Sequence, residues 1–259
     1  MDVLTDDAIA GDWRIWQRRR GHRYSLDDVA TAWEATRDRP DARRCLDLGC
    51  GIGSVLLMVA WRLPEARLTG VEAQDESVDL ARRNVERNGL EARVALVHRD
   101  LRDRALTDSL PDAPFDLVTG TPPYMPVGQG TPSPDPQRAH ARMELRGGVE
   151  EYVAAAARLL APDGTLVVCA DARAPQRVLD AAAAAGLATL RRRDVIPRAR
   201  AKGPLFTLWT LGLAQPPPGD ILVAPPLVAR DEHGARTDEA HGIRRFFGLP
   251  VDEGEAPSP

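Results

Sequence analysis

The sequence predicts an α/β fold, with a doubly wound, mostly parallel sheet of seven strands and an antiparallel edge strand. Three observations favour this fold. Strand-like runs alternate with helix-like segments from residue 41 onward, glycines cluster after the first of these runs, and the last two runs have no helix between them. Alternating strands and helices are typical of a parallel sheet with helices on both faces. Two strands joined without a helix predict the antiparallel edge.

The expected strands are short runs rich in apolar residues and bounded by turn residues. In chain order they are 44–48, 67–71, 94–97, 115–120, 165–170, 187–195 and 205–213. Helices are expected where apolar residues recur with helical spacing between these strands. They are 54–62, 76–88, 149–160 and 176–185. Gly89 and Gly186 follow two of these helices at the position where glycine commonly ends a helix.

The 259 residues are enough for one large domain with short additions at either end. We expect an N-terminal helical lead-in over 1–40, because residues 13–16 and 26–36 carry helix-like patterns. The ligand-binding domain is expected over 41–213. A proline-rich linker then opens a small C-terminal appendage, 214–259, whose tip we expect to be disordered.

Composition limits the classes of function. The net charge is −4 and the pI about 5.8, so a nucleic acid would have to meet a local basic patch. The cysteines, Cys45, Cys50 and Cys169, are odd in number and lack metal spacing, so we expect neither a disulfide framework nor a bound metal. No apolar run approaches the roughly 20 residues that span a bilayer, and the start lacks a secretory signal. A cytoplasmic location is expected, without membrane contact.

A glycine cluster with an internal acid is the strongest local motif. Gly49, Gly51 and Gly53 follow the first strand, and Asp47 precedes them. Glycines let the backbone turn tightly and approach a ligand closely. A dinucleotide-binding pattern would require a third glycine at the position of Ser54. Because an acid in this turn disfavours a pyrophosphate, the motif suits a cationic or zwitterionic ligand.

Two further acids follow the next two strands. Glu72 comes about 20 residues after the glycines, where a carboxylate can bind ribose hydroxyls. Asp100, followed by Leu101, ends the third strand. Ligands of open α/β sheets bind outside the carboxyl ends of the strands, so these acids and the glycines indicate one ligand site. The alternative is a glycine turn that serves only close packing of helix on strand.

This motif resembles the first motif of class I S-adenosylmethionine-dependent methyltransferases, D-x-G-x-G-x-G. The resemblance implies the Rossmann-like fold of that class and S-adenosyl-L-methionine as the cofactor. It places Glu72 on the ribose and Asp100 and Leu101 beside the adenine. The residues implied for the methionine end are Asp47, Gly49, Gly51 and Gly53.

After the fourth strand, Thr121-Pro122-Pro123-Tyr124 resembles the [D/N]-P-P-[Y/F] motif of methyltransferases that modify base amines or the glutamine amide. An sp² amine is a poor nucleophile, and acceptors for its two protons increase its nucleophilicity. Prolines give a rigid turn with free carbonyls, and the aromatic ring offers a face for a base. The resemblance implies that Thr121 and Pro122 orient the acceptor and that Tyr124 stacks on it. Thr121 departs from the motif, because its hydroxyl is shorter than Asn or Asp.

Two further stretches are similar to the tRNA1(Val) adenine-37 N6-methyltransferases and related small-domain methyltransferases. One is 21–27, a basic and aromatic turn before a helix, and the other is the arginine-bearing segment 138–144. The resemblance covers roughly 20–213. It implies Ser25 and Asp27 near the cofactor. The residues implied for substrate binding are Arg23, Tyr24, Arg138 and Arg142.

Arginine clusters at 18–23, 138–146 and 191–202 agree with an RNA partner, although a solvated arginine-rich surface is the alternative. We therefore expect an N-methyltransferase acting on structured RNA, with adenine N6 of tRNA as the favoured acceptor. Glutamine methylation on a protein, a small-molecule acceptor and a cofactor-binding scaffold without catalysis remain open. The sequence does not indicate an oligomeric state.

Overall fold

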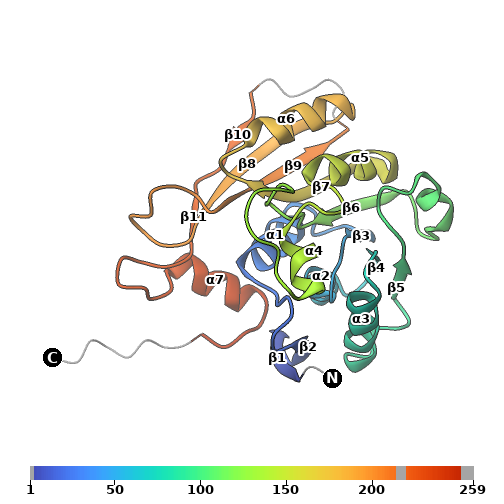
Figure 1. The fold of residues 1–259 in the computed structure, drawn as a ribbon, viewed down its shortest axis with the longest axis horizontal. Coiled ribbons are helices and arrows are strands. Elements are labelled where there is room, and N and C mark those ends of the chain that lie inside the picture. Colours follow the sequence, from blue (N-terminus) through green and yellow to red (C-terminus); the bar gives the residue numbers. More distant parts are fainter. Residues whose placement is uncertain (1–2, 214–219, 252–259) are drawn as a thin grey trace.

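The computed structural model describes residues 3–213 and 220–251 (Figure 1). Most of the linker and the C-terminal tip that we expected to be disordered lie outside these residues. Strands and helices alternate along the main part of the chain, as predicted. Among the described residues, no helix has the length and apolar character that a bilayer crossing requires.

The seven predicted strands are present and form one mostly parallel sheet, which confirms the fold class (Figure 1). In spatial order the full sheet is β10-β8-β9-β7-β6-β3-β4-β5, and β11 also pairs with β8. The strands are β3 Arg44–Leu48, β4 Arg67–Glu72, β5 Val94–His98, β6 Phe115–Gly120, β7 Leu160–Asp171, β8 Ala188–Ile196, β9 Phe206–Gly212, β10 Leu222–Val223 and β11 Leu227–Val228.

The antiparallel strand is not at the edge where we expected it. β9 runs antiparallel to both of its neighbours and lies between β7 and β8. The crossover from β7 to β8 leaves a gap one strand wide, and β9 turns back into that gap. Both edges of β9 are therefore hydrogen-bonded, and β8 presents its outer edge to β10 and β11.

Helices cover both faces of the sheet. One core cluster joins β1, β2, α1, α2, α3 and α7 to one face, and a second joins α5 and α6 to the other. The helices are α1 Leu26–Asp38, α2 Ser54–Arg62, α3 Asp75–Arg87, α4 Pro136–Arg142, α5 Val149–Leu159, α6 Pro175–Ala184 and α7 Asp238–Phe246, with a 3₁₀ helix at Arg104–Ser109. The carboxyl ends of β3, β4, β5 and β6 therefore meet at one edge.

The helix predicted at residues 13–16 is wrong. This segment lies in β2 (Trp13–Arg18), which pairs antiparallel with β1 (Leu4–Ala10). Two side-chain amides, from α3 and from the residue that caps its C-terminus, bind the other edge of β2. Asn84 Oδ1 accepts from the backbone N–H of Trp16 at 2.7 Å, and Asn88 Oδ1 accepts from that of Arg14 at 3.0 Å. Four residues are too few to separate helical from strand periodicity. The second lead-in helix, 26–36, is confirmed as α1.

The C-terminal appendage packs on the main body of the fold. β10 and β11 extend the sheet beyond β8, and Phe247, directly after α7, is fully buried. The backbone N–H of Gly11, in the β1–β2 turn, donates to the Phe247 carbonyl at 2.7 Å. Arg62 of α2 lies over the Phe246 ring, 3.9 Å from its centre. The division of the chain at residues 40 and 213 stays a prediction.

Candidate active site

The glycine turn forms the floor of a recess at the carboxyl ends of the strands. Gly49, Gly51 and Gly53 have φ values of 61°, 55° and 89°, in the left-handed region that favours glycine. A Cβ on Gly49 would lie 2.2 Å from the Tyr152 hydroxyl of α5. The turn therefore depends on glycine both for its backbone conformation and for the close approach of Tyr152. The recess has an empty volume of about 860 Å³, including the part open to solvent.

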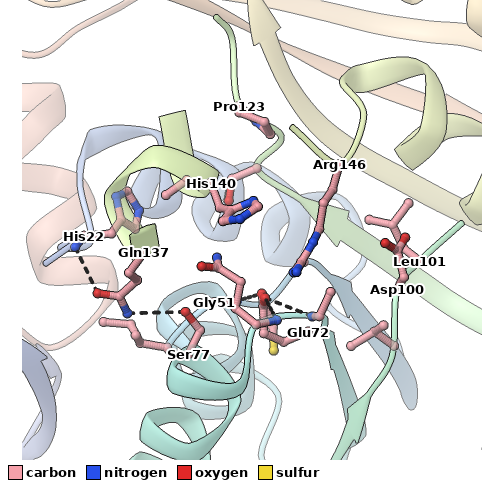
Figure 2. Close-up of a pocket in the computed structure, with 18 of the residues that line it drawn as sticks. His22, Gly51, Glu72, Ser77, Asp100, Leu101, Pro123, Gln137, His140 and Arg146 are labelled. Atoms are coloured by element: carbon pink, nitrogen blue, oxygen red, sulfur yellow. Dashed lines mark hydrogen bonds between the residues drawn. The ribbon is translucent and has the colours of Figure 1, made fainter. Parts of the chain in front are cut away.

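Glu72, at the end of β4, is held rigidly at this floor. Its carboxylate accepts hydrogen bonds from the backbone N–H groups of Gly51 (2.9 Å), Ala73 (2.9 Å) and Gln74 (2.7 Å) (Figure 2). Burial raises the pKa of Glu72, and these hydrogen bonds oppose that rise. Because backbone donors fix the carboxylate, its remaining lone pairs face the recess in a defined position.

Asp100 and Leu101, after β5, line the side of the same recess. The Asp100 carboxylate forms a two-point ion pair with Arg102, with N–O distances of 2.9 and 2.7 Å. This hydrogen bonding by Arg102 lowers the pKa of Asp100. Asp100 is therefore ionised and already oriented by a neighbour.

Asp47 lies beneath the recess and is not part of its lining. Its side chain is 3% exposed, Oδ1 accepts from the Thr119 hydroxyl at 2.8 Å, and Oδ2 has no partner among the described residues. Burial raises the pKa of Asp47 to about 7, and the charge of Glu72 adds to the rise. A buried carboxylate without a cation is costly, so the site favours a cationic ligand.

The roof of the recess comes from α4 and the segment that follows it. Gln137 accepts a hydrogen bond from the backbone of His22 at 3.1 Å and donates to the Ser77 hydroxyl at 3.3 Å (Figure 2). It thereby ties α4 to α3 and to the loop before α1. His140 points into the recess, and its Nδ1 is buried without a partner in the described part of the chain. Burial and the charge of Arg146 lower the pKa of His140, so its imidazole is neutral at neutral pH.

Arg146 reaches from the roof into the space between Glu72 and Asp100 (Figure 2). Its charge lowers the pKa of both carboxyl groups, although it is not the largest influence on either. One guanidinium nitrogen, Nη1, is buried with no partner within the described ranges. The acids of the recess thus face a cation supplied by the chain itself, without a direct ion pair.

A second recess adjoins the first. It is lined by residues of the tetrapeptide after β6, by the start of α1 and by two arginines, Arg142 and Arg173. The residues common to both recesses are His22, Asp28, Thr121, Pro123 and Ala141. Each of the two joined recesses combines carboxylates with guanidinium groups, and their junction suits a reaction between two bound molecules.

A model of the methyltransferase small domain family matches residues 26–184. The chain belongs to this family. The Rossmann-like fold predicted from the sequence is thereby confirmed. The methyl donor of this class of methyltransferase is S-adenosyl-L-methionine, and its positive sulfonium and ammonium groups fit the acidic floor of the first recess.

Known small-domain relatives act on different acceptors. The chain is 32% identical over 126 residues to a tRNA1(Val) (adenine(37)-N6)-methyltransferase of Porphyromonas gingivalis, covering 49% of each protein. It is 36% identical over 142 residues to a release factor glutamine methyltransferase of Geobacter sulfurreducens, covering 52% of this chain and 48% of the relative. The chain thus spans about half the length of these relatives.

A solved structure with a similar fold is a predicted O-methyltransferase from Agrobacterium tumefaciens. It has a TM-score of 0.67 and 19% identity, and the similarity covers 88% of this chain and 100% of that chain. At this identity the similarity concerns the fold alone. It supports the overall fold described above.

The residues predicted for the two sites of this small-domain methyltransferase divide into two groups. Those that line at least one recess are Gly49, Gly51, Glu72, Asp100, Leu101, Ser25, Asp27, Thr121, Pro122, Pro123, Tyr124 and Arg142. Those that line neither are Asp47, Gly53, Arg23, Tyr24 and Arg138. Gly53 instead caps α2, and Asp47 lies below the floor.

That Arg23 and Tyr24 bind the substrate stays a prediction; in this structure both side chains contact the N-terminal hairpin. The Arg23 guanidinium pairs with Asp7 at 3.0 Å and binds the Thr5 hydroxyl at 2.6 Å, and the Tyr24 hydroxyl donates to the Ala8 carbonyl at 2.9 Å. Both side chains therefore attach α1 to the β1–β2 hairpin. Sequence reasoning could not foresee this, because it assigned no hairpin to the lead-in.

Tyr124 lines the second recess, and its contacts with other side chains were not predicted from the sequence. Its hydroxyl donates to Cys169 Sγ at 2.8 Å, and its ring lies parallel to Phe206 with the centres 6.3 Å apart. The stacking of Tyr124 on a base stays a prediction. No local pattern in the sequence indicates a role for Asp28, Gln137, Tyr152 or Arg173, because their positions depend on contacts between distant elements. Among the described residues, no cluster has the composition of a metal site.

Proposed function

We propose that this chain is an S-adenosylmethionine-dependent N-methyltransferase that acts on an exocyclic base amine of RNA, with adenine N6 of tRNA as the acceptor. The observation that carries the proposal is the pair of joined recesses. The first supplies acids for a cationic methyl donor, and the second combines the Thr121–Tyr124 turn with arginines at its border.

The charges of the second recess fit a nucleotide. The guanidinium group of Arg142 can bind a backbone phosphate, which positions a strand without reading its sequence. Arg173, which pairs with Asp171 at 2.8 Å, is the second arginine at this border. Asp27 and Asp28 provide oxygens that can accept the protons of a base amine. The base itself has to leave its stack to enter such a recess. A cytoplasmic location, where unmodified tRNA is available, belongs to the same proposal.

Methyl transfer of this kind requires no covalent bond between the protein and either reactant. The amine must approach the methyl carbon in line with the carbon–sulfur bond, within a desolvated site. Residues shared by the two recesses are placed to hold both partners in that alignment. The Thr121 hydroxyl and the rigid Pro122-Pro123 turn orient the amine.

The test is transfer of a labelled methyl group from S-adenosylmethionine to unmodified total tRNA, with a protein extract in parallel. Glu72→Gln is the matched control, because it keeps the side-chain shape and removes one negative charge from the first recess. We expect wild-type protein to produce N6-methyladenosine in tRNA and Glu72→Gln to produce much less. Label that appears only in protein would favour glutamine methylation, which the release factor methyltransferase relative makes the second candidate.

A further inference from the structure

Asp28 is a buried acid surrounded by other acids. Its side chain is on the first turn of α1 and is 5% exposed. The strongest charges acting on it are those of Asp27 and Asp47, both negative. Within residues 3–213 and 220–251 it forms no ion pair. A carboxyl group in such surroundings resists ionisation unless a cation or a proton donor comes close.

A second unusual feature of Asp28 is its position relative to the two recesses. It lines both recesses, together with Thr121 and Pro123 of the tetrapeptide. A methyl group that leaves a donor in the first recess for an acceptor in the second has to cross the boundary between them. Asp28 is the only acid among the residues common to the two linings.

Two hydrogen bonds fix the position of the Asp28 carboxyl group and use only part of its capacity to accept. Oδ2 accepts from the backbone N–H of Ser25 at 2.8 Å, and Oδ1 accepts from the Ser54 hydroxyl at 3.1 Å. Ser54 is the first residue of α2, directly after the glycine turn. Each carboxylate oxygen has a second lone pair, so both can accept one further hydrogen bond.

We propose that Asp28 is a catalytic residue, which supplies the carboxylate that Thr121 lacks and takes a proton from the amine during methyl transfer. The proposal rests on the function proposed above. It also explains why the tetrapeptide can carry Thr121 where the related motif has Asn or Asp, because the acceptor comes from α1 instead.

The step conserves atoms and charge. The amine nitrogen attacks the methyl carbon of the sulfonium, and the carbon–sulfur bond breaks with its electron pair remaining on sulfur. The nitrogen gains the methyl group and loses one proton to the Asp28 carboxylate. The products are S-adenosylhomocysteine, the N-methylated base and a neutral Asp28 carboxyl group, which returns its proton to solvent after product release.

The titration of Asp28 gives the step a pH dependence. Burial, with the charges of Asp27 and Asp47, raises the pKa of Asp28 to about 8. The other titratable groups around it are His22, Tyr24, Tyr124 and Cys169. Burial lowers the pKa of His22 and raises the pKa values of the two tyrosines and the cysteine, so all four groups are neutral at neutral pH. Because only the ionised form accepts a proton, kcat rises with pH through the ionisation of Asp28.

A purely structural role is the competing explanation, since the bond from Ser25 also caps α1. Asp28→Asn retains the side-chain shape and one oxygen but cannot take a proton. Thr237→Ala is the matched control for lost capping, because Thr237 Oγ1 accepts from the Ala240 N–H at the start of α7 and lines neither recess. Thermal unfolding of both variants reports the capping effect separately from catalysis.

The experiment measures S-adenosylmethionine affinity by calorimetry and kcat on tRNA at saturating donor across pH. We expect Asp28→Asn to lower kcat at least about 100-fold, to change the donor Kd by less than about threefold, and to remove the rise of kcat with pH. Thr237→Ala should keep the wild-type kcat and pH profile. The proposal is overturned if Asp28→Asn retains kcat, or if it loses donor affinity while kcat at saturation persists, which would make Asp28 a donor ligand.

The failure of this proposal is distinguishable from the failure of the function on which it rests. If wild-type protein labels a protein glutamine and not tRNA, the RNA proposal is wrong, and the same Asp28→Asn comparison on that amide decides the role of Asp28. If Asp28→Asn does not fold, the wild-type pH profile decides, because a flat kcat between about pH 6 and 9 excludes an ionising proton acceptor. No transfer by wild-type protein to either acceptor overturns both proposals.

Discussion

Replacing Asp47 with asparagine should stabilise the protein in the absence of its cofactor. The pKa of this carboxyl group rises from the ordinary 3.8 to about 7 on folding, so the folded state binds the proton more tightly than the unfolded state. The folded state therefore keeps its full stability below about pH 4, and it loses the contribution of the neutral Asp47 carboxyl group as the pH rises through about 7. Proteins whose carboxylates form ion pairs show the opposite trend, because ionisation of those groups stabilises the folded state.

The magnitude follows from the size of the pKa change. A rise of about 3 units, at about 1.4 kcal/mol per unit, corresponds to roughly 4 kcal/mol lost above about pH 8. The Asp47→Asn substitution removes this penalty but leaves a buried amide N–H group without a partner, which costs about 1–3 kcal/mol. The net gain at about pH 8 is therefore on the order of 1–3 kcal/mol, or several degrees in Tm for a domain of this size.

The assay is urea or thermal unfolding of cofactor-free wild type and Asp47→Asn at about pH 5 and about pH 8.5. We expect the advantage of the variant to grow by roughly 2–3 kcal/mol between these values. S-adenosylmethionine should then raise the Tm of wild type and have much less effect on the variant. The reasoning is refuted if the stability difference does not change with pH. Equal cofactor-induced shifts in both proteins would remove Asp47 from the cofactor site.

Two further predictions concern Arg146 and Phe247. Arg146 lies between Glu72 and Asp100, in the space predicted for the cofactor. Arg146→Ala should therefore tighten S-adenosylmethionine binding by about 3–10-fold in calorimetry, since no internal cation has to be displaced; weaker binding would show that the guanidinium is a cofactor ligand. Phe247 is fully buried in the core that α7 shares with α2 and the β1–β2 hairpin. Phe247→Ala should therefore lower the unfolding free energy by about 3–5 kcal/mol in urea titrations. A loss under about 1 kcal/mol would show that the C-terminal segment is not part of the core.

Local patterns were sufficient where one element determines its own structure. Helix α3 carries apolar residues at helical spacing and ends before Gly89, and strand β6 is a short apolar run, so both were predicted within a residue or two. The same patterns misplaced residues 13–16, because β2 forms its hydrogen bonds with β1, with Asn84 of α3 and with Asn88 directly after α3. Those partners are distant in sequence, and no four-residue pattern contains them.

The position of the antiparallel strand shows the same limit. The sequence indicated two final strands without an intervening helix, and both exist as β8 and β9. Which of them occupies the inner place depends on the crossover from β7 and on the pairing of β10 and β11 with the outer edge of β8. Strand order is decided by the packing of the whole sheet, so chain order alone did not predict it.

Sequence patterns were enough to establish the fold class, the cofactor class and the residues at the strand ends. Glycines in a left-handed turn and acids directly after strands are local features, and the parallel topology brings them to one edge. Which other groups meet them there depends on the folded arrangement. Asp28 from α1, Gln137 and His140 from α4, and Arg146 from the segment before α5 converge because separate helices close over the same edge. Their neighbours, and therefore their pKa values and chemistry, follow from contacts between segments that are far apart in the chain.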